Sequence, residues 1–162
     1  MSDRIGQSVV IDNRGGAGGV TGTDVVAKAA PDGHTLALTS AGALAIAPAL
    51  QRMPYAPLRD LKPISLVAKS PELLTVPASV PAKNLVEFIA LVKSQPGKFN
   101  FASTGLGSMS HLSSELLKTS AGLDIVHVPY SGAAPAINDL LPGRVQMLFS
   151  DMQIPLPPLQ AG

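Results

Sequence analysis

The stretch from Phe99 to Leu112 holds the residue types best suited to binding a small anion. It reads Phe-Asn-Phe-Ala-Ser-Thr-Gly-Leu-Gly-Ser-Met-Ser-His-Leu, an apolar strand followed by a Ser/Thr/Gly turn that opens a helix. Such a turn directs free backbone N–H groups and small hydroxyls to the positive end of the helix dipole. No Asp, Glu, Lys or Arg lies between Lys98 and Glu115, so fixed dipoles are expected to hold the anion. The same pattern also occurs as a plain connection in α/β folds.

An enzyme is the alternative interpretation of this stretch, because serines lie close to a histidine. An α/β hydrolase-like site would use Ser108 as nucleophile and His111 as base. However, the Gly-x-Ser-x-Gly elbow that exposes such a nucleophile is absent from the sequence. Neither Gly-rich segment supplies the Lys of a P-loop, and Thr21 replaces the third Gly of a dinucleotide fingerprint. No His pair has metal-ligand spacing. We therefore expect no catalytic residues, no metal and no cofactor.

Composition excludes several classes of partner. The 162 residues carry a net charge of +1, 14% charged residues and 4% aromatic residues, without a Lys/Arg cluster. Nucleic-acid binding needs a basic surface and stacking rings, so it is not expected. The absence of cysteine excludes disulfides and Cys-based zinc sites. No apolar run approaches the roughly 18 residues of a membrane span, and the first residues lack the apolar segment of a signal peptide.

Strands and helices that alternate along the chain must position the turn. The predicted strands are 8–12, 34–39, 64–68, 73–76, 99–101, 124–128 and 145–149. The predicted helices are 21–30, a small-residue segment ending at 50, 84–95, 108–121 and 135–141. This alternation predicts a mostly parallel sheet with helices on its faces, in which ligands bind at the carboxyl ends of strands. Asp151 follows the last strand, where it is expected either to cap a helix or turn or to contact a ligand.

Motifs spread in order along the whole chain resemble the solute receptors of tripartite tricarboxylate transporters, often called Bug-type receptors. These motifs are Asp12–Gly19, Ala29–Leu36, Ser79–Ala82, Gln95–Lys98, Ser103–Ser108 with His111–Leu112, His127–Gly132, Ala133–Ala136 and Asp139–Gly143. Each motif alone is weak, but their collinear order is specific. The resemblance implies a periplasmic-binding-protein-like (type II) clamshell of the α/β class, with mostly parallel sheets flanked by helices.

The resemblance further implies a periplasmic receptor rather than an enzyme. Such a receptor captures a small carboxylate (a di- or tricarboxylate, an acidic amino acid or an aromatic carboxylate) and delivers it to membrane permease subunits. The turn at 103–108 would bind the carboxylate, the loop at 40–42 would line the cleft from the first lobe, and loops at 130–132 and 150–151 would shape specificity. The implied ligand-binding residues are Ser40, Ala41, Gly42, Ser103, Thr104, Gly105, Gly107, Ser108, His111, Tyr130, Gly132 and Asp151.

Compared with the family pattern, the chain is expected to be truncated at both ends. Residues 1–68 resemble a partial first lobe without its first strand and returning C-terminal part, and residues 69–162 resemble a nearly complete second lobe. Because the missing strand would lie centrally in its sheet, 9–11 and 36–39 should pair across a gap, pair with a second chain, or be poorly ordered. This allows self-association through unpaired strands, and a truncated receptor without activity is a further alternative.

Overall fold

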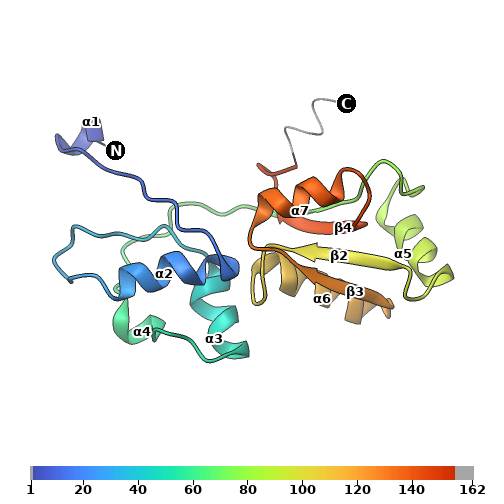
Figure 1. The fold of residues 1–162 in the computed structure, drawn as a ribbon, viewed down its shortest axis with the longest axis horizontal. Helices are drawn as coiled ribbons and strands as arrows, with labels where there is room; N and C mark the ends of the chain where they lie inside the picture. The colour runs from blue at the N-terminus through green and yellow to red at the C-terminus, as the bar shows by residue number, and fades with distance from the viewer. Residues whose placement is uncertain (1, 156–162) are drawn as a thin grey trace.

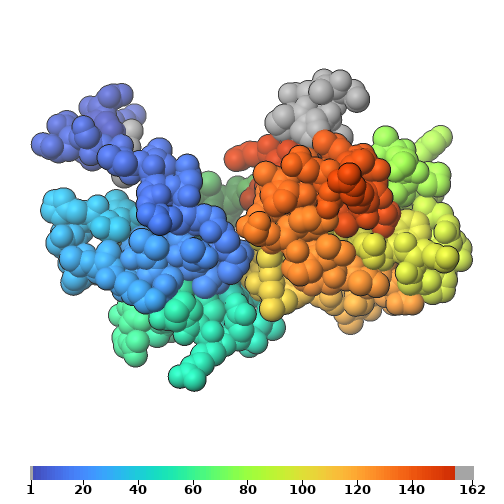
Figure 2. Space-filling model, viewed as in Figure 1, coloured from blue at the N-terminus to red at the C-terminus, as the bar shows by residue number. Residues whose placement is uncertain are grey.

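A computed structural model describes residues 2–155 of the chain. Figure 1 shows two parts side by side, joined by an extended segment that runs from residue 61 to residue 71. The first part, residues 2–60, is built of short helices. The second part, residues 72–155, contains the sheet. Figure 2 shows a hollow between the two parts.

The second part is a four-stranded sheet in the order β1-β4-β2-β3. Its strands are β1 (Glu72–Thr75), β2 (Phe99–Ser103), β3 (Ile125–Pro129) and β4 (Met147–Asp151). Strand β2 pairs in parallel with both β3 and β4, whereas β1 pairs antiparallel with β4. The expected α/β class with a mostly parallel sheet is therefore confirmed.

Helices cover both faces of this sheet, as Figure 1 shows. They are α5 (Leu85–Ser94), α6 (Met109–Ala121) and α7 (Ala133–Leu140). Side chains of α5 and α6 pack with Phe101 and Met147, whereas α7 packs with the neighbouring Ala102 and Leu148. Successive strand residues point to opposite faces, so β2, β3 and β4 each contribute to two apolar cores.

Local signals in the sequence explain where α5 and α6 begin and end. Asn84 accepts a hydrogen bond from the backbone N–H of Glu87 at 3.0 Å, and the Glu87 carboxylate accepts one from the N–H of Lys83 at 2.8 Å. Asn84 and Glu87, three residues apart, thus cap the helix much as in a capping box, although the Glu87 carboxylate binds the N–H one residue before the cap. Ser108 caps α6 by accepting from the N–H of His111 at 3.2 Å, and Gly122 ends the helix with a left-handed φ of 61°. The turn before α6 is thereby fixed in place.

The first part has a small helical core. Its elements are α1 (Ser2–Ile5), η1 (Ala17–Gly19), α2 (Val20–Ala27), the π-helix η2 (Gly42–Ile46), α3 (Ala47–Leu50) and α4 (Pro57–Asp60). Val20, Ala43, Ala47 and Tyr55 are buried together, and the Tyr55 hydroxyl donates to the carbonyl oxygen of Ala43 at 2.8 Å. This core holds the loops at 15–19 and 40–43 against the second part.

The predicted strands 8–12, 34–39 and 64–68 are wrong as regular elements. No backbone hydrogen bond joins any two of these segments within residues 2–155. Apolar side chains are instead exposed, with Val10 at 88%, Leu38 at 85% and Ile64 at 79%. A strand needs neighbouring N–H and C=O groups, and these segments do not supply them to one another. The expected pairing across a gap is therefore wrong.

Candidate functional site

The two parts meet at a contact between glycine-rich loops. A Cβ atom added to Gly105 would lie 2.7 Å from the backbone nitrogen of Gly18, closer than real Cβ atoms come. A Cβ atom added to Gly42 would lie 3.4 Å from the carbonyl oxygen of Gly107. The loops at 15–19 and 40–43 thus lie against the turn before α6, with little room for side chains between them.

A cleft of about 170 Å³ opens at this contact. It is lined by Gly18, Ser40, Ser70, Glu72, Thr104, Ser108, Met109, Ser110, Ser150, Asp151 and Ile154. Both parts and the connecting segment contribute to it. The cleft lies at the carboxyl ends of β2 and β4 and at the N-terminus of α6, which is where ligands bind in open α/β sheets.

Three hydroxyl groups gather in the cleft at the N-terminus of α6. The Ser110 hydroxyl lies 2.9 Å from that of Ser108 and 3.2 Å from that of Thr104, and it accepts from the Thr104 N–H at 2.9 Å. Helix N-termini attract anions because their first N–H groups lack partners within the helix. The arrangement can therefore bind a carboxylate without a basic side chain.

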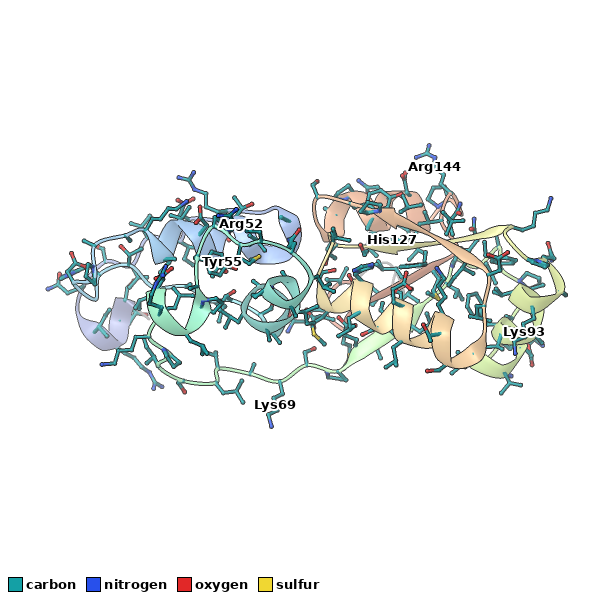
Figure 3. The ribbon with its side chains drawn as sticks, turned by 90° about the horizontal axis from the view of Figure 1, so that it is seen from below. Arg52, Tyr55, Lys69, Lys93, His127 and Arg144 are labelled. Carbon is teal, nitrogen blue, oxygen red and sulfur yellow. The ribbon has the colours of Figure 1, made fainter. Side chains whose placement is uncertain are left out.

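Ser103 and His111 support this turn and do not line the cleft. The Ser103 hydroxyl is fully buried, 2.7 Å from Nε2 of His127, and it accepts from the N–H of Gly105 at 3.3 Å. Nδ1 of His111 accepts from the N–H of Gly107 at 3.3 Å. His127, which Figure 3 labels within the sheet, was not predicted as part of the site. Its position beneath the turn depends on the register of the β2–β3 pair, in which His127 is the partner of Phe101, and this register cannot be read from the sequence.

The geometry does not match a serine hydrolase. The Ser108 hydroxyl accepts from the backbone N–H of His111, and the His111 ring accepts from the backbone of Gly107. Within residues 2–155 no hydrogen bond joins the Ser108 hydroxyl to the His111 ring, as a nucleophile and its base require. In the same residues no group of three or more His, Asp or Glu side chains is placed to hold a metal ion.

Two carboxylates line the same cleft. Glu72 of β1 and Asp151 of β4 are direct partners in the antiparallel pair, and Ser113 of α6 donates a hydrogen bond to Glu72. Burial raises the pKa of Glu72; the Ser113 hydrogen bond lowers it and the negative charge of Asp151 raises it. The Ser150 hydroxyl, on a residue only 2% exposed, is buried and has no hydrogen-bond partner among residues 2–155.

The structure gathers part of the predicted site in this cleft. Of the expected residues, Ser40, Thr104, Ser108 and Asp151 line it. Ala41, Gly42, Ser103, Gly105, Gly107 and His111 belong to the loops and the turn around it. Tyr130 and Gly132 do not line it; the Tyr130 hydroxyl donates to Asp139 at 2.8 Å and Gly132 precedes α7. Asp151 ends β4 and begins a turn, in which its carbonyl oxygen accepts from the N–H of Ile154 at 3.0 Å; within residues 2–155 it caps no helix.

Several lining residues were not predicted. They are Gly18, Ser70, Glu72, Met109, Ser110 and Ile154. Gly18 does have a signal in the sequence, because it lies in a glycine-rich loop after a predicted strand. Glu72 has no such signal. The prediction considered only the carboxyl ends of strands, whereas Glu72 is the first residue of the antiparallel strand β1, whose N-terminal end lies at the cleft.

Comparison with known proteins places this architecture among periplasmic binding proteins. The structure of the periplasmic binding protein BugD matches 99% of this chain and 54% of its own, with a TM-score of 0.91 and 35% identity. An R. palustris protein solved with adipate matches 99% of this chain and 54% of its own, with a TM-score of 0.92 and 36% identity. MatC from Rhodopseudomonas palustris, solved with bound malate, matches 99% of this chain and 55% of its own, with a TM-score of 0.89 and 36% identity.

The family model for the tripartite tricarboxylate transporter family receptor matches residues 1–162, and the chain belongs to this family. Protein BugT of Bordetella pertussis is 42% identical over 164 residues, which is 100% of this chain and 50% of BugT. The chain therefore spans about half the length of the curated relatives it matches. These findings confirm the predicted family and the predicted periplasmic-binding-protein-like fold. Among the helices of residues 2–155, none has the length and apolar character needed to span a bilayer.

Proposed function

We propose that this chain is the ligand-binding part of a periplasmic receptor that captures a small carboxylate and delivers it to transporter permease subunits. The observation that carries the proposal is the cleft at the N-terminus of α6, where Thr104, Ser108 and Ser110 present their hydroxyls. Two structural relatives were solved with adipate and malate, both carboxylates. The chain then acts as a binding protein and not as an enzyme.

In this proposal residues 1–68 form the first lobe and residues 69–162 the second, with the cleft between them. Ser40 contacts the ligand from the first lobe, and Thr104 and Ser108 bind its carboxylate from the second. Gly42, Gly105 and Gly107 allow the two lobes to approach. The buried Ser103 and the His111 ring hold the turn in its binding geometry.

Thermal unfolding of the chain with and without a panel of mono-, di- and tricarboxylates tests this proposal. A carboxylate at about a hundred times its dissociation constant should stabilise the folded chain by roughly 2.7 kcal/mol. A melting transition that no carboxylate shifts would contradict the proposal and would indicate a receptor fragment without binding activity.

The substitution Ser108→Ala should reduce the ligand-induced shift. It also removes the cap of α6, which costs about 1 kcal/mol of stability by itself, so the ligand-induced shift is compared within each variant. Ser120→Ala, at an exposed position of the same helix, is the matched control and should leave the shift unchanged. If the parent chain hydrolyses esters and Ser108→Ala abolishes that activity, the result would instead support the hydrolase interpretation.

A further inference from the structure

Two stacked histidine rings hold the turn before α6 in place. Nδ1 of His111 accepts a hydrogen bond from the backbone N–H of Gly107 at 3.3 Å. Nε2 of His127 lies 2.7 Å from the Ser103 hydroxyl, which in turn accepts from the N–H of Gly105. Figure 3 shows His127 in the half of the second part that faces the first part. The backbone at both glycines of the turn is therefore fixed through imidazole nitrogens.

The contact between His111 and Gly107 requires a neutral ring. A neutral imidazole has one N–H donor and one acceptor nitrogen, and here Nδ1 must be the acceptor. In the imidazolium form both nitrogens carry hydrogens, so the Gly107 N–H would face a second N–H. Protonation of His111 therefore breaks this contact. The Ser103 contact is more tolerant, because its hydroxyl can also donate to the carbonyl oxygen of Gly105 at 3.3 Å and so accept from a protonated His127.

The lower ring of the stack, His127, resists a positive charge. Burial and the nearby His111 lower the pKa of His127; Glu115 raises it and Lys118 lowers it. Strand β2 places the uncharged ring of Phe101 on the other side of His127. A charge on His127 thus has no close carboxylate from β2 to balance it.

The elements around the turn add no charge that changes this order. The loop at 15–19 and the helices η2 and α3 over residues 42–50 carry no charged residue. Glu72 and Asp151, the carboxylates of the cleft, lie on β1 and β4, which β2 separates from β3. The first proton that the stacked pair takes up is therefore placed on His111.

A turn released from His111 cannot keep its other contacts. A Cβ atom added to Gly107 would lie 3.1 Å from Ala47 of the first part, so there is little room for this residue to move. The same turn carries the Thr104 and Ser108 hydroxyls, and the Ser108 hydroxyl accepts from the N–H of His111 itself. Loss of the His111–Gly107 contact therefore disturbs both the hydroxyls and the contact with the first part.

We propose that His111 is a proton-sensitive positioning residue: its neutral ring holds the turn in the geometry that binds a carboxylate, and its protonation releases the turn and weakens binding. This inference rests on the proposed function, in which the turn binds the carboxylate. Its sign is opposite to that of simple attraction, since a positive ring close to an anion would strengthen binding. Carboxylate binding should therefore release protons at mildly acidic pH.

Isothermal titration calorimetry of the full chain with succinate, malate and adipate, between about pH 8 and about pH 5.5, tests this sign. In the parent chain, the dissociation constant of each carboxylate that binds should rise about threefold to tenfold as the pH falls, the range expected for one lost hydrogen bond. His111→Asn places an amide oxygen close to the position of Nδ1 and takes up no proton, so its profile should be flatter. The titration of the carboxylates themselves affects both chains alike. His34→Asn, in an exposed loop, is the matched control and should keep the parent profile.

An NMR titration without ligand distinguishes failure of this inference from failure of the proposed function. In the parent chain the Gly107 amide and the ring nitrogens of His111 should shift with one common midpoint, and the spectrum of His111→Asn also shows whether this variant is folded. The inference is overturned if binding strengthens as the pH falls, if His111→Asn keeps the parent profile, or if the Gly107 amide does not follow His111; the proposed function survives each of these results. If none of the carboxylates binds at any pH, the proposed function and this inference both fail.

Discussion

The imidazole rings of His111 and His127 are stacked, with centroids 4.2 Å apart and planes inclined by 17°. Phe101 also stacks on His127, at 4.8 Å. His111 belongs to the first turn of α6, whereas the other two rings belong to neighbouring strands of the sheet. The three rings therefore connect the proposed carboxylate-binding turn directly to the core of the second part.

The stack makes the stability of the fold depend on pH. Burial and the nearby His111 lower the pKa of His127; Glu115 raises it and Lys118 lowers it. The folded chain therefore keeps His127 neutral at a pH where the unfolded chain, with a pKa near 6.5, takes up a proton. We expect the free energy of unfolding to fall as the pH drops below 6.5 and on through the lowered pKa. Urea unfolding at a series of pH values measures this.

The variant His127→Phe keeps a ring in the stack and removes the titrating group. Its stability should therefore depend less on pH between neutral and mildly acidic conditions than that of the parent chain. His34→Gln, in an exposed loop, is the control and should keep the parent profile. An unchanged slope in His127→Phe would show that another group causes the pH dependence.

Glu72→Gln should stabilise the chain at neutral pH. Because the pKa of Glu72 is raised above 4.5, mainly by burial, its ionisation costs more in the folded than in the unfolded chain. The cost is absent below pH 4.5, where both states are protonated, and it grows as the pH rises through the raised pKa. Thermal midpoints of the two chains should therefore converge in acid and separate at neutral pH. A variant less stable than the parent at neutral pH would contradict this.

Gly105→Ala should destabilise the chain and weaken carboxylate binding. The new methyl group would lie 2.7 Å from the Gly18 nitrogen, and the φ of 136° at this position disfavours residues with a Cβ atom. Backbone strain of this kind costs about 1–3 kcal/mol, before the clash is added. Gly33→Ala is the control, since φ is also positive there but nothing lies within 4 Å. Equal losses of stability in denaturant unfolding would argue against the contact between the two loops.

The exposed segments of the first part should promote self-association. Val10, Leu38 and Ile64 lie in segments that pair with no strand in the described part of the chain and that can add to the edge of another chain. Sedimentation should detect oligomers whose fraction grows with concentration, and Leu38→Lys should reduce that fraction. Leu58→Lys, at an exposed position of α4, is the control and should have little effect. A chain that stays monomeric at all concentrations would refute this expectation.

The second part could be predicted well because its signals are local. The cap at Ser108, the left-handed Gly122 and the apolar strand before the turn are all readable from residue type and spacing. In the first part the helix predicted at 21–30 is present as α2, and the helical segment predicted to end at 50 is present as η2 and α3. The strands could not be predicted, because apolar β-branched residues at 8–12 indicate a preference for strands but not the presence of a partner. The Glu72–Asp151 pair escaped prediction for a related reason. It depends on the order of strands in the sheet, which brings together residues 79 positions apart in the chain.

The hydroxyls of Thr104, Ser108 and Ser110 have one more consequence. In each of the two hydroxyl–hydroxyl contacts of Ser110, with Thr104 and with Ser108, either oxygen can be the donor. Rotation of the O–H bonds can therefore reverse the polarity of the whole set while every heavy atom stays in place. The turn can present hydrogens to a charged oxygen and lone pairs to a protonated one. The same arrangement of heavy atoms can therefore bind a ligand in either protonation state, because only the hydroxyl hydrogens have to move.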